Sequence, residues 1–149
     1  MRIETKIIYD NTYLKALNAT SKDTPIFEFN DCIKLSKVVD VYDGDTIKVC
    51  FSIDDTCHNI YRFTVRMYGY NSEEIRHSTK DPLRDDKKKL GIEHRDALSK
   101  MVFDKLVYLE CMGYDKYGRL LANVFLDEAK TNCVNELMVS KVGCKPYFC

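Results

Sequence analysis

The stretch VVDVYDGDTIKVCFSI, residues 38–53, decides how this chain folds. Its second half alternates apolar and polar side chains from Ile47 to Ile53, which is the period of a β-strand with one buried face. Its first half, with the apolar residues Val38, Val39 and Val41, is typical of a preceding strand. Asp43-Gly44-Asp45 lies between the halves and consists of turn residues, so the stretch predicts two antiparallel strands joined by a tight turn.

A third strand is expected to follow, from Ile60 to about Gly69. One of its faces would carry the apolar side chains of Tyr61, Phe63, Val65 and Met67, and the other Arg62, Thr64 and Arg66. Arg66 is therefore expected to leave the core side, whereas Tyr61 is expected in core or cross-strand packing.

The second half of the chain predicts helices and two more strands. A polar connection at residues 71–89, with a solvated lysine run at 87–89, precedes a helix from about Leu90 to Lys105. Strands are expected at 106–112 and 120–126, joined by a hairpin that turns at Gly113 and Gly118. Thr131 or Asn132 would cap a last helix that runs to about Lys141. The expected buried residues of the two helices are Ala97, Leu98, Met101 and Val102, and Val134, Leu137 and Met138.

Three strands, a helix, two strands and a helix form the pattern of an OB-fold, a five-stranded closed barrel. The predicted class is therefore α+β, a five-stranded OB-fold β-barrel with two or three helices. Residues 1–32 have poor periodicity and loop signals before Pro25, so we expect an N-terminal extension there and one barrel domain at 33–149.

The composition restricts the choice of partner and compartment. Lys and Arg total 23, as do Asp and Glu, so binding of nucleic acid would need a local patch. Seven cysteines without a Cys-x-x-Cys pair indicate reduced thiols and argue against structural zinc. With no bilayer-length apolar run and no signal-like segment at Met1–Asp10, we expect an intracellular protein without a membrane partner.

Three short pieces carry chemistry together: Asp43-Gly44-Asp45-Thr46, Arg66 with Glu74, and Asp115-Lys116-Tyr117-Gly118-Arg119. Carboxylates that can hold a hard cation, two arginines and a further carboxylate are what hydrolysis of a phosphodiester requires. Alone, each piece is more often a plain turn, a solvated side chain or a hairpin. Their combination favours a nuclease-type site.

The same pieces resemble the motifs of the staphylococcal-nuclease-like (thermonuclease) family, from about Lys37 to the end of the chain. Residues 41–46 (VYDGDT) resemble its first motif, residues 66–74 (RMYGYNSEE) its second, and residues 115–119 (DKYGR) its third. Val134-Asn135-Glu136 resembles the start of its last helix.

The resemblance implies an OB-fold nuclease that uses Ca²⁺, or another divalent cation, to hydrolyse DNA and RNA. Single strands would be preferred, because their bases can spread over an open groove. The implied metal ligands are Asp45, with Asp43 nearby, the side chain of Asn71 and the backbone carbonyl of Ser72. Glu74 would position or deprotonate water, Arg66 and Arg119 would clamp the scissile phosphate, and Lys116 and Tyr117 would contact a terminal phosphate or stack near the nucleotide.

Two departures from the family motif keep a second hypothesis open. Asn71 is neutral where the family has a ligand aspartate, and Glu73 replaces the usual proline. Because Ca²⁺ affinity depends on ligand charge, the alternative is a weakened or inactive OB-fold module that binds nucleic acid or protein. Among the histidines, His77 is the only one expected near the site, without a role, and His94 is expected to be a packing residue.

Overall fold

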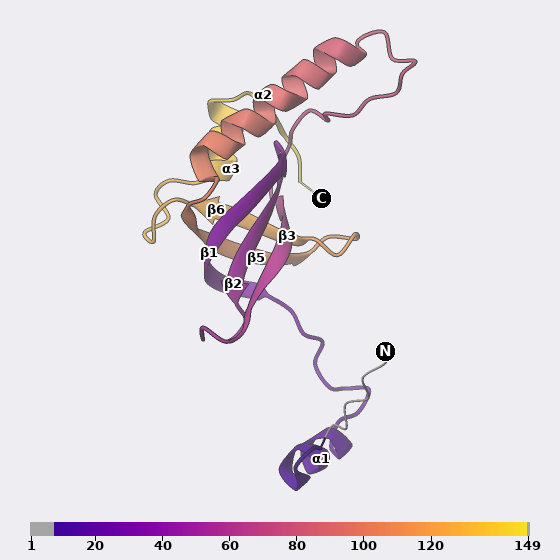
Figure 1. The fold of residues 1–149 in the computed structure, drawn as a ribbon, viewed down its shortest axis with the longest axis vertical. Coiled ribbons are helices and arrows are strands. Elements are labelled where there is room, and N and C mark those ends of the chain that lie inside the picture. Colours follow the sequence, from indigo (N-terminus) through magenta and orange to yellow (C-terminus); the bar gives the residue numbers. More distant parts are fainter. Residues whose placement is uncertain (1–7, 149) are drawn as a thin grey trace, which may run out of the picture.

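The computed structural model describes residues 8–148. Residues 1–7 of the expected N-terminal extension and Cys149 of the expected barrel domain lie outside the described residues. Its centre is a closed barrel with the strand order β1-β2-β3-β6-β5 (Figure 1). These strands are β1 (Asn30–Asp43), β2 (Thr46–Ser52), β3 (Ile60–Met67), β5 (Leu106–Tyr114) and β6 (Leu120–Phe125). With three helices added, the prediction of an α+β, OB-fold β-barrel is confirmed.

Four of the five strand pairs in the barrel are antiparallel, and the fifth closes it. Strand β3 pairs in parallel with β6 through Val65↔Leu120, Arg66↔Leu121 and Met67↔Ala122. The end of β3 therefore lies beside the start of β6, although more than fifty residues separate them in the sequence.

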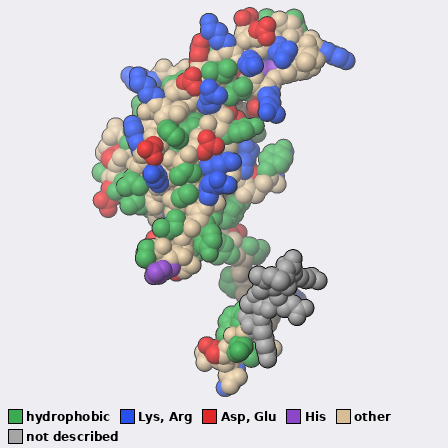
Figure 2. Space-filling view, in the orientation of Figure 1, with side chains coloured by type: hydrophobic (Ala, Val, Ile, Leu, Met, Phe, Trp, Pro, Cys, Tyr) green, Lys and Arg blue, Asp and Glu red, His purple; other side chains and the backbone are tan. Residues whose placement is uncertain are grey.

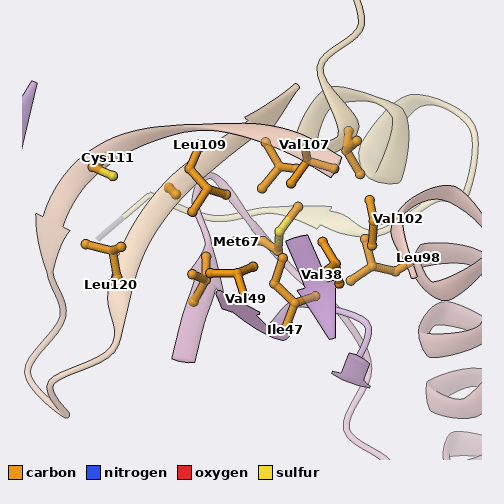
Figure 3. Close-up of a cluster of buried hydrophobic side chains, with 14 of the residues drawn as sticks. Val38, Ile47, Val49, Met67, Leu98, Val102, Val107, Leu109, Cys111 and Leu120 are labelled. Carbon is orange, nitrogen blue, oxygen red and sulfur yellow. The ribbon is translucent and has the colours of Figure 1, made fainter. Parts of the chain in front are cut away.

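The core fills the barrel and continues toward helix α2 (Arg84–Val102) (Figure 3). Ile47 and Val49 of β2 are fully buried, as are Leu98 and Val102 of α2. The alternation predicted for β2 holds along the whole strand, whereas in β3 it is lost at Ile60–Arg62, where three successive residues are exposed. Ile53 lies beyond the end of β2 and is 39% exposed. Tyr61 is 54% exposed and stands opposite Phe51, so of the two expected settings it has a cross-strand position and not a core one.

Helix α2 begins at Arg84, six residues before the expected start, and ends at Val102. Its first turn holds Asp85 and Asp86, whose negative charges suit the positive end of the helix dipole. The lysine run expected in a loop is therefore helical. At the other end, Phe103 is extended and Asp104 has a φ of 60°, which stops the helix before Lys105.

Helix α3 (Val134–Ser140) has Cys133 at its N-cap, without a capping side-chain bond, so the predicted cap at Thr131 or Asn132 is wrong. Both residues instead donate their backbone N–H groups to the Asp127 carboxylate, at 3.0 and 2.8 Å. Asn135 fixes the helix to the barrel. Its Oδ1 accepts the Val124 N–H at 2.7 Å, and its Nδ2 donates to the carbonyls of Tyr68 and Ala122 at 2.8 and 3.0 Å.

Three further elements were not predicted. Strand β4 (Tyr70–Asn71) pairs with β7 (Lys145–Pro146), which ties the end of the chain to the segment after β3. Helix α1 (Asn11–Asn18), capped by Asp10, lies apart from the barrel and buries no residue (Figure 1). No helix within residues 8–148 is long and apolar enough to span a bilayer.

Candidate active site

A cleft of about 1080 Å³ brings all of the predicted site residues together. They come from four segments: the β1–β2 turn, the end of β3, β4 with the residues that follow it, and the β5–β6 hairpin. The residues concerned are Asp43, Asp45, Arg66, Asn71, Ser72, Glu74, Lys116, Tyr117 and Arg119.

The β1–β2 turn is held rigidly by bonds to its backbone. Asp43 Oδ1 accepts the Asp45 N–H at 3.1 Å, and the buried Tyr70 hydroxyl donates to the Gly44 carbonyl at 2.7 Å. A Cβ on Gly44 would lie 2.5 Å from Ser72 Cβ, so only glycine allows this close approach. The turn and the segment after β4 therefore form one packed unit.

The two aspartates of the turn are both buried. Asp45 accepts bonds from the Ser72 N–H at 3.0 Å and the Thr46 hydroxyl at 3.1 Å. Asp43 has fewer partners, and burial, followed by repulsion from Asp45 and Glu74, raises its pKa from 3.8 to about 6. The pair is therefore short of positive charge.

Arg66 leaves the core side, as expected, and its guanidinium joins several parts of the site. It donates to the carbonyls of Met67 at 2.7 Å and Tyr70 at 2.9 Å. Its other amino nitrogen bonds Asn71 Oδ1 and lies 3.4 Å from the Asp45 carboxylate. Arg66 therefore engages the oxygens of two candidate metal ligands.

The β5–β6 hairpin presents the second arginine. Asp115 accepts bonds from the Arg119 backbone N–H at 2.8 Å and from its Nε at 2.6 Å. Burial alone would raise the pKa of Asp115, but hydrogen bonds from Arg119 and Tyr117 lower it below 3.8. The exposed Tyr117 ring lies 5.1 Å from Lys116 Nζ and 5.4 Å from Arg119 Cζ, within cation–π range.

Glu74 is exposed to the cleft, and its backbone is held by residues of α2 and of its own loop. The Glu73 N–H donates to His94 Nδ1 at 2.9 Å, and His77 Nε2 donates to the Glu74 carbonyl at 2.6 Å. The expectation that His77 alone lies near the site is therefore wrong. The only sequence signal for His94 is a polar residue within the apolar stripe of the helix.

The acidic part of the site is small. Within residues 8–148, no three His, Cys, Asp or Glu side chains are close enough to form a metal-binding cluster. Asp43, Asp45 and Asn71 nevertheless bring carboxylate and amide oxygens to the cleft, which are the donors that a hard divalent cation prefers, and in this structure the Asn71 oxygen is bonded to Arg66. Arg66 is the positive charge beside Asp45 and balances one of these two buried carboxylates, so the remaining negative charge favours such a cation.

Comparisons with known proteins identify the family. No curated protein matches the chain. The family model described as staphylococcal nuclease homologue matches residues 64–144, which is more than half of the chain. The match contains Arg66, Glu74 and Arg119 and begins after the Asp43–Asp45 turn. This chain belongs to the staphylococcal nuclease homologue family.

Proposed function

We propose that this protein is a divalent-metal-dependent nuclease, with Ca²⁺ as the expected metal, that hydrolyses phosphodiester bonds of DNA and/or RNA. The observation that carries the proposal is that one cleft holds Asp43, Asp45, Arg66, Glu74 and Arg119. Family membership supports the same reaction class.

Each group has a role that suits its place in the cleft. Arg66 and Arg119 carry fixed positive charges toward the phosphate, where negative charge develops as water adds to phosphorus. Glu74 accepts a proton from the attacking water as its oxygen bonds to phosphorus. The phosphorus–oxygen bond on the opposite side breaks, and the leaving oxygen takes a proton from solvent to become the hydroxyl end of the cleaved strand. Asp43, Asp45, Asn71 and the Ser72 carbonyl would hold the cation, which supplies Lewis-acid stabilisation of the phosphoryl oxygens.

Single-stranded substrate is favoured by the shape and charge around the hairpin. Tyr117 is 72% exposed beside Lys116 and Arg119, so an unpaired base can stack on its ring while a phosphate meets the cations. Figure 2 shows acidic and basic side chains mixed over the face in view, and Lys and Arg equal Asp and Glu in number, so attraction of nucleic acid needs a local group of cations such as Lys116 and Arg119.

Cleavage of labelled single-stranded DNA and RNA tests the proposal, in Ca²⁺, Mg²⁺, Mn²⁺ or EDTA. We expect cleavage only with a divalent cation, and a loss of about 10²- to 10⁴-fold in kcat for Glu74→Gln. Glu128→Gln, at an exposed loop position, is the matched control and should cleave like the wild type. Equal activity of Glu74→Gln and the wild type would exclude the assigned role.

A binding module without cleavage activity is the second candidate, favoured by the state of Asn71. This residue is neutral, and its oxygen is bonded to Arg66. Asn71→Asp should raise Ca²⁺ affinity, since affinity grows with ligand charge. Binding of single strands by a wild type that never cleaves, with cleavage gained in Asn71→Asp, would favour this candidate.

A further inference from the structure

Helix α2 supports the segment that carries Glu74. Gly91 and His94 lie three positions apart, so they share one face of the helix, and both are buried. That face meets the backbone of Glu73 and Glu74. His94 itself does not line the cleft, so any effect it has on the reaction is indirect.

The contact at Gly91 leaves no room for a side chain. A Cβ at this position would lie 2.6 Å from the Glu74 carbonyl oxygen and 3.0 Å from that of Glu73. Glycine is unfavourable inside a helix. The close approach of the loop backbone explains why a glycine nevertheless occupies position 91. The helix therefore fits against the loop backbone without a gap.

The contact at His94 is a directed hydrogen bond. Nδ1 accepts the Glu73 N–H at 2.9 Å, which requires an unprotonated Nδ1 and places the ring proton on Nε2. Burial lowers the pKa of His94, which favours this neutral form. On the other side, His77 bonds the Glu74 carbonyl and lies 3.2 Å from the Glu73 carboxylate. The Ser72–Glu73 peptide unit is thus held by His94 and the Glu74–Ile75 peptide unit by His77, so the backbone that carries Glu74 is fixed from two directions.

We propose that His94 is a positioning residue, which fixes the Glu73 N–H and thereby aims the Glu74 carboxylate at the water in the cleft. The proposal rests on the nuclease function and adds the group that orients its general base. Because His94 does not touch the cleft, its loss should lower kcat and leave KM nearly unchanged.

The test compares His94→Ala with His94→Asn, whose side-chain oxygen can take the place of Nδ1 as acceptor. Amide hydrogen exchange of Glu73 and steady-state cleavage of single-stranded DNA are measured for each variant. In His94→Ala we expect exchange about tenfold faster and kcat about tenfold lower, the equivalent of one hydrogen bond. His94→Asn should restore most of both. Leu98→Ala, one turn further along the same stripe, is the packing control and should not accelerate Glu73 exchange selectively.

Glu73→Pro gives a second measurement, because proline has no N–H for His94 to accept. In that background, His94→Ala should lower kcat no further. Unchanged Glu73 exchange in His94→Ala would overturn the proposal whatever the activity, and so would faster exchange with unchanged kcat. A wild type that cleaves under no metal condition would overturn the nuclease function, whereas the exchange data would still show whether His94 holds the loop.

Discussion

Replacing Asp43 by asparagine should stabilise the metal-free protein at neutral pH, although it removes a candidate metal ligand. Asp43 is buried beside Asp45, and its pKa is raised from 3.8 to about 6. Between these values the folded protein binds more protons than the unfolded chain. The contribution of this carboxyl to the free energy of unfolding therefore falls as the pH rises from about 4 to about 6, and stays low above that.

The size of the effect follows from the same pKa values. Their difference corresponds to at most about 3 kcal/mol, and partial access of water to the turn reduces the expected gain to about 1–2 kcal/mol. Asparagine keeps an oxygen that can accept the Asp45 N–H, so the turn should keep its 3.1 Å bond.

Urea unfolding in EDTA at pH 7.5 and pH 4 measures this prediction. Asp43→Asn should exceed the wild type in free energy of unfolding at pH 7.5, and most of the gain should vanish at pH 4. Asp40→Asn, at an exposed position of β1, is the control and should change little at either pH. Excess Ca²⁺ should stabilise the wild type more than the variant, because binding to the folded state adds to its stability. Equal stabilities in EDTA at pH 7.5 would refute the reasoning.

Three further predictions test other parts of the structure. Arg119→Lys should lower kcat/KM by about 10²-fold, because lysine lacks the planar fork of donors. Arg95→Lys on α2 is the control, and a kcat/KM of Arg119→Lys equal to that of the wild type would contradict the assignment of Arg119. Asn135→Ala should lower the free energy of unfolding by about 2–3 kcal/mol, because it leaves the buried Val124 N–H without an acceptor; a loss below about 0.5 kcal/mol in chemical denaturation would count against that bond. Native thiol labelling followed by mass spectrometry should modify the exposed Cys57 well before the buried Cys111, whose pKa is raised to about 12, and the reverse order would contradict the barrel packing.

The sequence predicts the barrel where local pattern and tertiary burial agree. Strand β2 alternates cleanly because one face meets the core, with Ile47 and Val49 fully buried. Strand β1 begins at Asn30 with the opposite pattern: Lys34 and Ser36 face inward, while Ile33 and Leu35 are exposed. The local sequence pattern does not predict that Lys34 faces inward, because the partners of its ammonium group lie on another segment. Lys34 Nζ donates to the Ile53 carbonyl at 3.2 Å and to the Asp55 carboxylate at 3.3 Å.

The same limit applies to the candidate site. Asp43-Gly44-Asp45 and the hairpin could be assigned to one cleft because each is a compact motif at the end of a predicted strand. The early start of α2 was missed because charged residues suit an exposed helix as well as a loop. The partner of His94 is a backbone N–H twenty-one residues away, and side-chain identity gives no signal for such a bond.

The parallel seam between β3 and β6 also determines when the cleft can exist during folding. Arg66 pairs with Leu121 there, so the two arginines share a cleft only after a loop of more than fifty residues has closed. Closing a loop of this length lowers the entropy of the chain before any stabilising contact has formed, which makes such long-range pairing slow. A chain still being synthesised therefore carries no complete cleft until β6 has emerged, and the seam, with only three residue pairs, is where a local opening would separate Arg66 from Arg119.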